Sequence, residues 1–425
     1  MLSYYLTGGL GLTLASVGAH VTLIWPPTGV ALFALLAWGR PMWPALWLGS
    51  FLVNLHVGFP PALAMVIACG NTLGPVLAAE ALKRTGFDGR FSRARDVVLY
   101  VAFGALAGMA ITASCGTAAL LAFGVQPAGQ AWTVWSTWWL GDALGAVLVG
   151  PALLTLYRPA ADDTRLGARF EPIVAWNGLL VAGLFSLSPL SPFGTGLPPL
   201  FALPFLLWLA LRFDARHATG AALLLAVLTL WGVFVQRGPF VDTDGTAQLL
   251  RVWAYLLTLG IASLLITALR SESTRALAET RASEARYRTL VENLPGAVFR
   301  STADRRQKPI YLSDGIEAIS GLPASAFTSG ERTLAELVHP DDAVADELAA
   351  SLTRRAPYVI EYRLTDASGR EHWILERGRA SSASPGEACW IDGVMFDISE
   401  RKAVEAELAG HRQHLEQLVA ARPRH

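Results

Sequence analysis

The first 270 residues of this 425-residue chain are largely apolar, whereas the remainder is rich in charge. Up to Arg270 the chain contains 14 Lys and Arg and 10 Asp and Glu, and the rest contains 20 and 24. Stretches such as 97–124 exceed the roughly 20 apolar residues that a helix needs to cross a bilayer. Trp, of which the chain has fourteen, settles at membrane–water interfaces. The front of the chain is therefore predicted to lie in lipid and the rest in water.

The apolar region divides into about ten segments, of which 28–38 and 199–211 are the least distinct. The segments are 4–24, 28–38, 42–57, 62–82, 97–124, 132–156, 173–189, 199–211, 218–236 and 249–269. They predict a polytopic all-α membrane domain with about 8–10 transmembrane helices. The amino terminus lacks the positive region of a cleavable signal peptide, so the first segment is expected to be a span.

Lys and Arg fall on alternate loops of this pattern. One set of loops contains Arg40, Lys83, Arg84, Arg90, Arg93, Arg95, Arg158, Arg165, Arg169, Arg212 and Arg216. The opposite loops contain Arg237, and Arg251 lies at the edge of a span. Positively charged loops remain in the cytoplasm. The amino terminus is therefore predicted to be periplasmic and everything after Arg270 cytoplasmic, where basic loops can contact anionic lipid.

Six polar side chains within the predicted spans are candidates for an intramembrane sensing site. They are His20, Asn54, His56, Asn71, Glu80 and Asp142. An ionisable group at the centre of a bilayer costs about 2.5–3.5 kcal/mol on insertion scales, which marks such residues as functional candidates. Glu80 stands near Lys83 and Arg84, which favours a paired group at the interface, and the two histidines lie near span ends. We expect Asp142 and Asn71 to line an internal polar site that responds to a ligand or to protonation.

Three short stretches carry a family resemblance: WPPTG at 25–29, GNTL at 70–73 and WWLGD at 138–142. With their surroundings they resemble the membrane-associated sensor domain of the first MASE class, over about residues 8–270. The resemblance implies a bacterial inner-membrane input domain of the kind found ahead of histidine kinases and diguanylate cyclases. It implies a role in signalling without naming a stimulus. Within the second stretch, Gly70 and Gly74 are spaced for close helix packing.

A charged segment without proline follows the last span and continues to Leu294. Its less polar residues are spaced alternately by four and three: Ala276, Thr280, Ser283, Tyr287, Leu290 and Leu294. Such a heptad-like stripe predicts a helix that pairs with a second copy of the chain, although Thr280 and Ser283 weaken the pattern. The stripe also suits an amphipathic helix packed on its own domain.

The segment after Pro295 and Gly296 reads as alternating strands and helices. Strands are expected at 297–300, 309–313, 358–365, 372–380 and 389–396, and helices at 314–320 and 341–355. This order, with EYRLTDASGREHWILERGRA and GVMFDISERK, resembles a PAS domain, an α+β fold with an antiparallel sheet, over about 283–400. The resemblance implies that Asp397 and Ser399 anchor the start of an outgoing helix and so serve in signalling.

The other reactive residues of the soluble region favour structural interpretations. His339-Pro340-Asp341-Asp342 suits a helix start, and His372 suits an exposed strand position rather than a haem ligand. The three cysteines show no metal-ligand spacing, and the flavin-reactive cysteine motif of light-sensing relatives is absent. We therefore predict no metal site and identify no cofactor, and the PAS ligand stays unknown. Lys and Arg are dispersed among acids, so no nucleic-acid partner is expected.

The chain is thus predicted to comprise a membrane sensor domain (1–270), a helical linker (271–286), a PAS domain (287–400) and a connector helix (401–425). Neither kinase boxes nor a GGDEF motif appears, and we predict no catalytic residue. The expected function is that of a dimeric membrane sensor that works through a downstream kinase or cyclase partner. Two alternatives remain: the regulatory part of a histidine kinase or diguanylate cyclase, and a transporter with a regulatory PAS domain.

Overall fold

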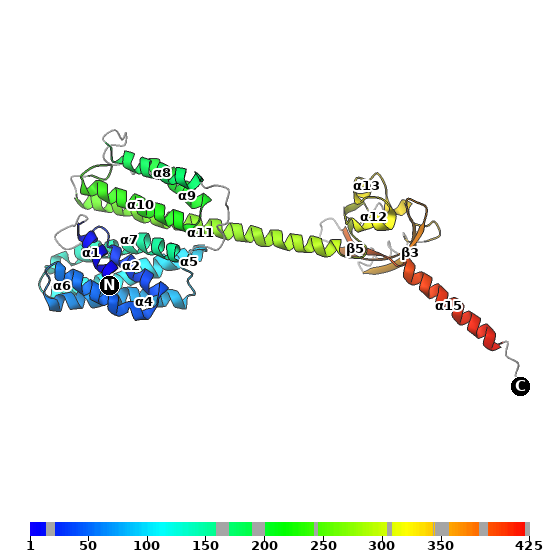
Figure 1. Ribbon diagram of the computed structural model, residues 1–425, viewed down its shortest axis with the longest axis horizontal. Coiled ribbons are helices and arrows are strands. Elements are labelled where there is room, and N and C mark those ends of the chain that lie inside the picture. Colours follow the sequence, from blue (N-terminus) through cyan, green and yellow to red (C-terminus); the bar gives the residue numbers. More distant parts are fainter. Residues whose placement is uncertain are drawn as a thin grey trace. The chain divides into compact units, whose positions relative to one another are not determined.

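The computed structural model describes residues 1–13, 22–158, 170–188, 200–241, 245–303, 308–342, 344, 357–381 and 390–420. The chain forms two compact units, Met1–Leu277 and Ala278–His425. Figure 1 shows the first unit as a bundle of helices and the second as a small sheet with helices. The predicted fold class, a helical membrane domain followed by a PAS-type antiparallel sheet, is confirmed.

Each of the ten apolar segments contains a helix of the first unit. The helices are α1 (Leu2–Thr13), α2 (Pro26–Ala37), α3 (Trp43–His56), α4 (Pro61–Arg84), α5 (Ala94–Leu99), α6 (Gly108–Ala122), α7 (Ala131–Tyr157), α8 (Phe170–Ser186), α9 (Leu203–Arg212), α10 (Ala215–Phe234) and α11 (Gly245–Glu292). A π-helical stretch, Tyr100–Ala107, joins α5 to α6. Among the described residues, five helices are long and apolar enough to cross a membrane. Helices α2, α8 and α9 are apolar but shorter, with 10–17 residues.

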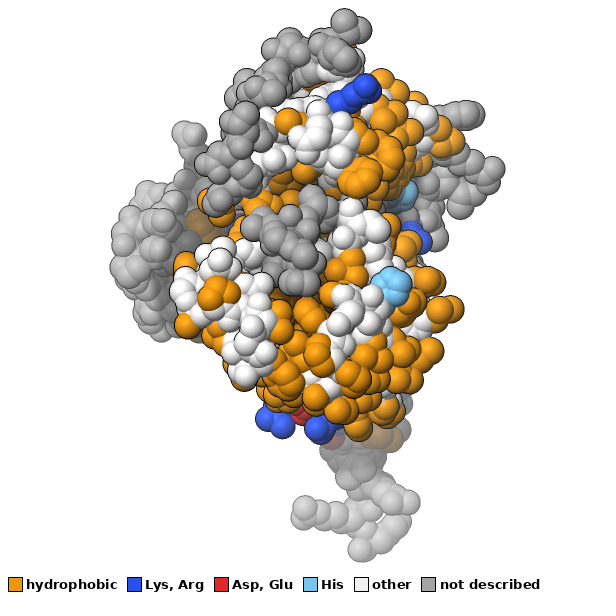
Figure 2. Space-filling view, turned by 90° about the vertical axis from the view of Figure 1, so that its left-hand side faces the viewer, with side chains coloured by type: hydrophobic (Ala, Val, Ile, Leu, Met, Phe, Trp, Pro, Cys, Tyr) orange, Lys and Arg blue, Asp and Glu red, His pale blue; other side chains and the backbone are white. Residues whose placement is uncertain are grey.

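Helix α7 lies at the centre of the bundle. Its Leu144 and Leu148 belong to one hydrophobic cluster with α8 to α11, while Ala143 and Val147 belong to a second cluster with α2, α4 and α6. Small residues bring the helices close together. Gly70 and Gly74 of α4 pack on α6 without room for a larger side chain, as their spacing predicts. Figure 2 looks at the left-hand side of Figure 1 and shows hydrophobic side chains over several areas of the described surface, interspersed with white polar and backbone atoms.

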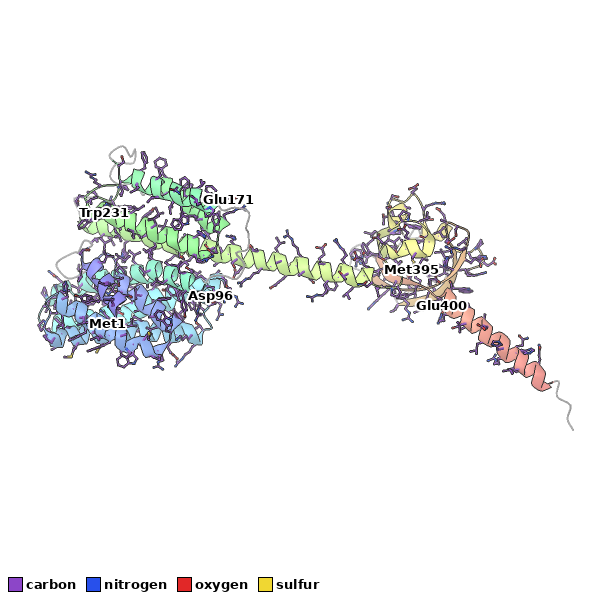
Figure 3. The ribbon with its side chains drawn as sticks, in the orientation of Figure 1. Met1, Asp96, Glu171, Trp231, Met395 and Glu400 are labelled. Atoms are coloured by element: carbon purple, nitrogen blue, oxygen red, sulfur yellow. The ribbon has the colours of Figure 1, made fainter. Side chains whose placement is uncertain are left out.

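Helix α11 contacts the loop between α4 and α5 where it leaves the bundle. Glu272 accepts a hydrogen bond from the Ala94 backbone amide at 3.2 Å, and an Arg275 guanidinium nitrogen lies 3.3 Å from Ser92 Oγ. Arg270 also donates to the carbonyl of Phe213, after α9. Several of the predicted basic loops therefore meet at one end of the bundle, near Asp96 in Figure 3.

The second unit is built on a five-stranded antiparallel sheet in the order β2-β1-β5-β4-β3. Its strands are β1 (Ala297–Thr302), β2 (Pro309–Leu312), β3 (Tyr358–Thr365), β4 (Glu371–Ser381) and β5 (Trp390–Asp397), and its helices include α12 (Gly315–Ser320), α13 (Ala324–Thr328) and α15 (Ser399–Ala420). In β3, Tyr358, Ile360, Tyr362 and Leu364 are buried, as their alternation predicts. The expected strands are present, whereas most of the helix expected at 341–355 falls outside the described residues.

Candidate functional site

The backbone before α2 is non-helical and lies against α7. The amide of Trp25 donates to the carbonyl of Gly141 at 3.0 Å. A Cβ added at Gly141 or Gly145 would meet the carbonyl of Thr22 or of Trp25, so only glycine lets the two backbones approach this closely. In a membrane, irregular backbone is tolerated where it is buried in protein or lines a cavity.

Asp142 lies near the middle of α7 and is completely buried, at 0% exposure. Thr28, in the first turn of α2, donates from its hydroxyl to Asp142 Oδ1 at 2.9 Å. The other carboxylate oxygen, Oδ2, has no hydrogen-bond partner among the described residues. The sequence separates Thr28 from Asp142 by 114 positions, and the α2–α7 contact joins them.

A small cavity of about 40 Å³ lies beside Asp142 and collects the polar side chains of several elements. Its polar lining consists of Thr22, Trp25, Asn54, Asn71, Trp138 and Asp142. Asn71 donates from Nδ2 to Ser50 Oγ at 3.0 Å, but its Oδ1 has no partner among the described residues. Trp25 Nε1 likewise has no hydrogen-bond partner in the described part of the chain. Among the described residues, the polar cavity thus presents two unpaired acceptors and one unpaired donor.

The sequence-predicted candidates separate into two groups. Asn54 joins Asn71 and Asp142 at the polar cavity and donates from Nδ2 to the Ser50 carbonyl at 2.8 Å. His56 instead contacts Tyr5, with 3.4 Å between Nδ1 and the phenol oxygen, and Glu80 pairs with Arg84 at 3.1 Å. The pairing of Glu80 agrees with the interfacial interpretation. His20 lies outside the described residues.

Trp25, Thr28 and Ser50 are parts of this site that the sequence did not reveal. Tryptophan is expected at membrane–water interfaces, and a serine or threonine in an apolar helix is usually bonded to its own backbone. The signal was Pro26-Pro27, which fixes a helix start inside the apolar region and places Thr28 in its first turn.

A second, larger cavity lies in the second unit, between the sheet and the segment around α13. Its volume is about 860 Å³, and its lining includes Phe299, Phe327, Tyr362, Glu376 and Met395. Glu376 is 6% exposed. Tyr358 donates to its Oε1 at 2.6 Å and Tyr362 to its Oε2 at 2.8 Å. This buried carboxylate therefore has a partner for each oxygen.

Burial raises the pKa of Glu376, although the two tyrosine hydroxyls act in the opposite direction. The pKa values of Tyr358 and Tyr362 are also raised, by burial first and by the neighbouring carboxyl second. Glu376 was not singled out from the sequence. Its position two residues after Ile374 in a strand places it on the buried face, which was the available signal.

The start of α15 is fixed to the sheet by Asp397 and Ser399. Asp397 Oδ1 accepts from the Ser399 amide, and Ser399 Oγ accepts from the Trp373 amide, both at 2.8 Å. Lys402 lies 2.6 Å from Glu361 of β3, and its ammonium lies 5.0 Å from the centre of the Trp373 ring. Figure 3 shows Glu400 at this junction between sheet and helix. A displacement of β3, at the edge of the sheet, would therefore move the start of α15.

His372 differs from its sequence interpretation as an exposed strand residue. Its side chain is only 17% exposed, and its two ring nitrogens lie 2.8 Å from Asp397 Oδ2 and 3.3 Å from Asp366 Oδ2. Burial tends to raise the pKa of Asp397, but hydrogen bonds from Ser399 and His372 lower it overall. The β4–β5 register places His372 beside the end of β5, which strand periodicity does not reveal. No cluster of metal-binding side chains occurs among the described residues.

Family comparisons match both parts of the chain. The MASE1 family model matches residues 1–274, and the model of the PAS fold matches residues 309–395. The first match covers more than half of the chain.

Several curated sensor proteins are similar to parts of this chain. The "Two-component sensor PprA" of Pseudomonas aeruginosa is 25% identical over 188 residues, 43% of this chain and 20% of that protein. The "Methyl sulfide methyltransferase-associated sensor" of Methanosarcina acetivorans is 27% identical over 115 residues, 26% of this chain and 11% of that protein. The matched region thus spans a fifth or less of either relative.

Among solved structures, a sensory box histidine kinase/response regulator from Burkholderia thailandensis is 29% identical to the matched part of this chain. The match covers 31% of this chain and 98% of that structure, with a TM-score of 0.26. A PAS domain from the fruit-fly ELK potassium channel covers 26% of this chain, with 15% identity and a TM-score of 0.23.

Proposed function

Since the chain belongs to the MASE1 family, we propose that it is a bacterial inner-membrane sensor whose polar cavity responds to the stimulus and whose helix α11 carries the response to the PAS domain. The membrane unit receives the signal and the PAS unit relays it through α15. A downstream kinase or cyclase then acts as the partner. The chain is proposed to divide into the membrane sensor domain (1–270), the helical linker (271–286), the PAS domain (287–400) and the connector helix (401–425).

The observation that carries the proposal is the set of unpaired polar atoms at the cavity. Asp142 and Asn71 are buried, at 0% and 5% exposure, yet each leaves one oxygen without a partner among the described residues. An unpaired buried polar group costs about 1–3 kcal/mol. A membrane protein that retains such groups uses them, because packing alone is achieved more cheaply by apolar residues.

A physical route leads from the polar cavity to the second unit. The cavity lies on α7, and α7 shares one hydrophobic cluster with Leu264 and Ala268 of α11. Farther along, Glu272 and Arg275 of α11 contact the α4–α5 loop. A shift of α7 or α4 would therefore change the position of α11, which continues without interruption to Glu292.

Two copies of the chain are proposed to pair through α11. All six residues of the stripe are exposed in the single chain, and Tyr287, Leu290 and Leu294 are between 40% and 67% exposed. Val404, Leu408 and Leu415 of α15 are likewise exposed. Heptad stripes of this kind are buried when two helices wind around each other.

The proposed topology has a periplasmic amino terminus and a cytoplasmic PAS unit. The meeting of the α4–α5 loop, Phe213 and Arg270 at one end of the bundle supports it, because the predicted cytoplasmic basic loops contribute these contacts. A reporter fused at Arg165 is expected to be cytoplasmic. An external reporter would contradict the topology.

The pairing is tested by disulfide cross-linking in membranes, in a chain whose three cysteines are replaced by serine. Ser283→Cys, on the stripe, is expected to form a disulfide between two copies within minutes of mild oxidation. The matched control Ala285→Cys lies about 200° away around the helix and is expected to react far more slowly. Equal slow reaction at both positions would contradict a dimer through this stripe.

The sensing role is tested in the same Ser283→Cys chain by adding Asp142→Asn. We expect the cross-linking rate to change several-fold, because the substitution alters the cavity while keeping its shape. The control is Glu80→Gln, which changes a carboxylate outside the cavity and is expected to leave the rate unchanged. Normal insertion with an unchanged rate in Asp142→Asn would remove the main support for the proposal.

The similarity to a two-component sensor favours one more specific role. We infer that the chain supplies the input region to a histidine kinase, either as part of a longer protein or through a partner. Co-purification with a kinase from the native host, or a longer native protein of the expected mass, tests this role. A diguanylate cyclase found in that position would replace it.

A further inference from the structure

We propose that the polar cavity beside Asp142 binds one small monovalent cation together with a water molecule. This inference rests on the proposed function only for its sensory meaning, since binding can be tested without a signal. It names what the sensor detects: a small inorganic cation or ammonium.

The charge of the cavity lining favours a cation. The described residues that line the polar cavity include the carboxyl group of Asp142 but no Lys, Arg or His. A buried charge is normally paired or coordinates an ion, because leaving it alone in a low-dielectric interior costs several kcal/mol. Such a carboxyl group otherwise takes up a proton, and a bound cation would supply the partner that keeps it ionised.

The second argument is the set of ligand atoms. Asp142 Oδ2 and Asn71 Oδ1 are hard oxygen donors, the type that alkali cations prefer, and both are unpaired within the described chain. Each is oriented by a hydrogen bond at the second terminal atom of the same group, because Thr28 donates to Asp142 Oδ1 and Asn71 Nδ2 donates to Ser50 Oγ. The positions of Asp142 Oδ2 and Asn71 Oδ1, the oxygens available to a bound ion, are therefore fixed.

Trp25 accounts for the water molecule, because its Nε1–H has no partner among the described residues and, as a donor, cannot coordinate a cation. A water molecule satisfies it, because water accepts this hydrogen bond while its oxygen also coordinates the ion. The cavity volume of about 40 Å³ has room for an ion and a water, since about 10–15 Å³ of such space holds one water. An organic ligand with several non-hydrogen atoms would not fit.

The backbone and the single carboxylate favour a monovalent ion. Carbonyl groups of non-helical backbone coordinate sodium ions in membrane transporters, and Thr22–Trp25 is non-helical backbone beside the cavity. A calcium ion takes about 6–8 oxygen ligands and usually several carboxylates. Asp142 is the only carboxylate among the described lining residues.

The test measures thermal unfolding of the full chain in lipid nanodiscs by tryptophan fluorescence. Choline chloride is replaced stepwise by NaCl, KCl or NH4Cl at constant ionic strength, because choline is too large for the cavity. We expect at least one small cation to raise Tm saturably, since a ligand of the folded state stabilises it by mass action. The responding ion identifies the natural guest among the three.

Variants separate this cavity from general salt effects. Asp142→Asn is expected to abolish the saturable rise, and Asn71→Ala to weaken the apparent affinity at least tenfold. The control Asp96→Asn changes another buried carboxylate, outside the cavity, whose Oδ2 has no partner among the residues that the structure describes; it is expected to retain the rise. Should Asp142→Asn fail to insert, Asn71→Ala carries the test.

A Tm rise that choline also produces, or one that persists in both Asp142→Asn and Asn71→Ala, would overturn the cation site. The failure of the proposed function is distinguishable from this result. If no small cation stabilises the chain but Asp142→Asn still alters cross-linking at Ser283→Cys, the cavity senses something other than a cation. If a cation binds but cross-linking never changes, the ion is structural.

Discussion

The two units each bury a carboxylate beside a cavity, but they satisfy it differently. In the second unit, Tyr358 and Tyr362 supply a hydroxyl to each oxygen of Glu376. In the membrane unit, Thr28 supplies one hydroxyl to Asp142, and Oδ2 is left without a partner among the described residues. This comparison indicates that a buried charge alone does not mark a binding site. An incomplete set of partners next to a cavity is the more specific sign.

The largest expected effect comes from making Glu376 resemble Asp142. The double substitution Tyr358→Phe and Tyr362→Phe removes both hydroxyls but keeps the rings. We expect it to lower the unfolding free energy of the 271–425 segment by about 3 kcal/mol, because each hydrogen bond to a charged group contributes about 1.5–3 kcal/mol. Urea denaturation measures this. A loss below about 1 kcal/mol would show that the two hydrogen bonds to Glu376 are not essential for the stability of this segment.

The second prediction concerns pH. Because burial raises the pKa of folded Glu376, the folded state holds its proton more tightly than the unfolded state. Its contribution to stability is therefore complete below the unfolded pKa, and it declines as pH rises through the folded pKa. Glu376→Gln is expected to remove this decline.

Urea midpoints of the 271–425 segment measured across this pH range test the prediction. The groups whose pKa values are lowered, such as Asp342 beside Arg363, contribute with the opposite sign, so the difference between Glu376→Gln and the parent isolates Glu376. An unchanged pH profile in the variant would show that Glu376 binds its proton equally in both states.

The next smaller effect concerns the hydrogen bond between Asp397 and the start of α15 in the second unit. Asp397→Ala is expected to cost about 1 kcal/mol, the usual value for a side chain that accepts from a helix-start amide. Hydrogen exchange in the first turn of α15 should accelerate, because this turn loses its attachment to the sheet. Glu407→Ala, in the exposed middle of the helix, should leave that exchange unchanged.

The smallest effect is expected for Asp142→Asn in a buffer that contains only choline as cation. The neutral isostere replaces a buried carboxylate whose Oδ2 lacks a partner among the described residues. It should therefore leave Tm unchanged or raise it, with a gain in unfolding free energy of about 1 kcal/mol at most. The same substitution should lower Tm relative to the parent when the bound cation is present. A large loss of stability in choline would show that Asp142 already has a complete set of partners.

Much of the fold could be predicted from the sequence because local patterns determine it. The ten apolar segments correspond to helices, and the alternation in residues 358–365 corresponds to β3 with its buried face. Pro295 and Gly296 end α11 close to the position where the periodicity changes. Span lengths were predicted less well, since an apolar run does not show where its helix begins and ends.

The candidate site could be predicted only in part. Asp142, Asn71 and Asn54 were found because a polar residue in an apolar segment is conspicuous. Their partners Thr28 and Ser50 were not, since hydroxyl residues are common in membrane helices and usually bond to their own backbone. Glu376 and the contacts of His372 were missed because each depends on which strands become neighbours.

Hydrophobicity and periodicity act over a few residues at a time, so the order of amino acids is enough to divide the chain into a lipid-embedded and an aqueous part. Which polar atoms find a partner depends on the tertiary structure. Thr28 reaches Asp142 only because glycines let α2 lie directly on α7. Tyr358 and Tyr362 reach Glu376 only through the pairing of β3 with β4. Hydrogen bonds act over about 3 Å, and the fold sets such distances between residues that are far apart in the chain.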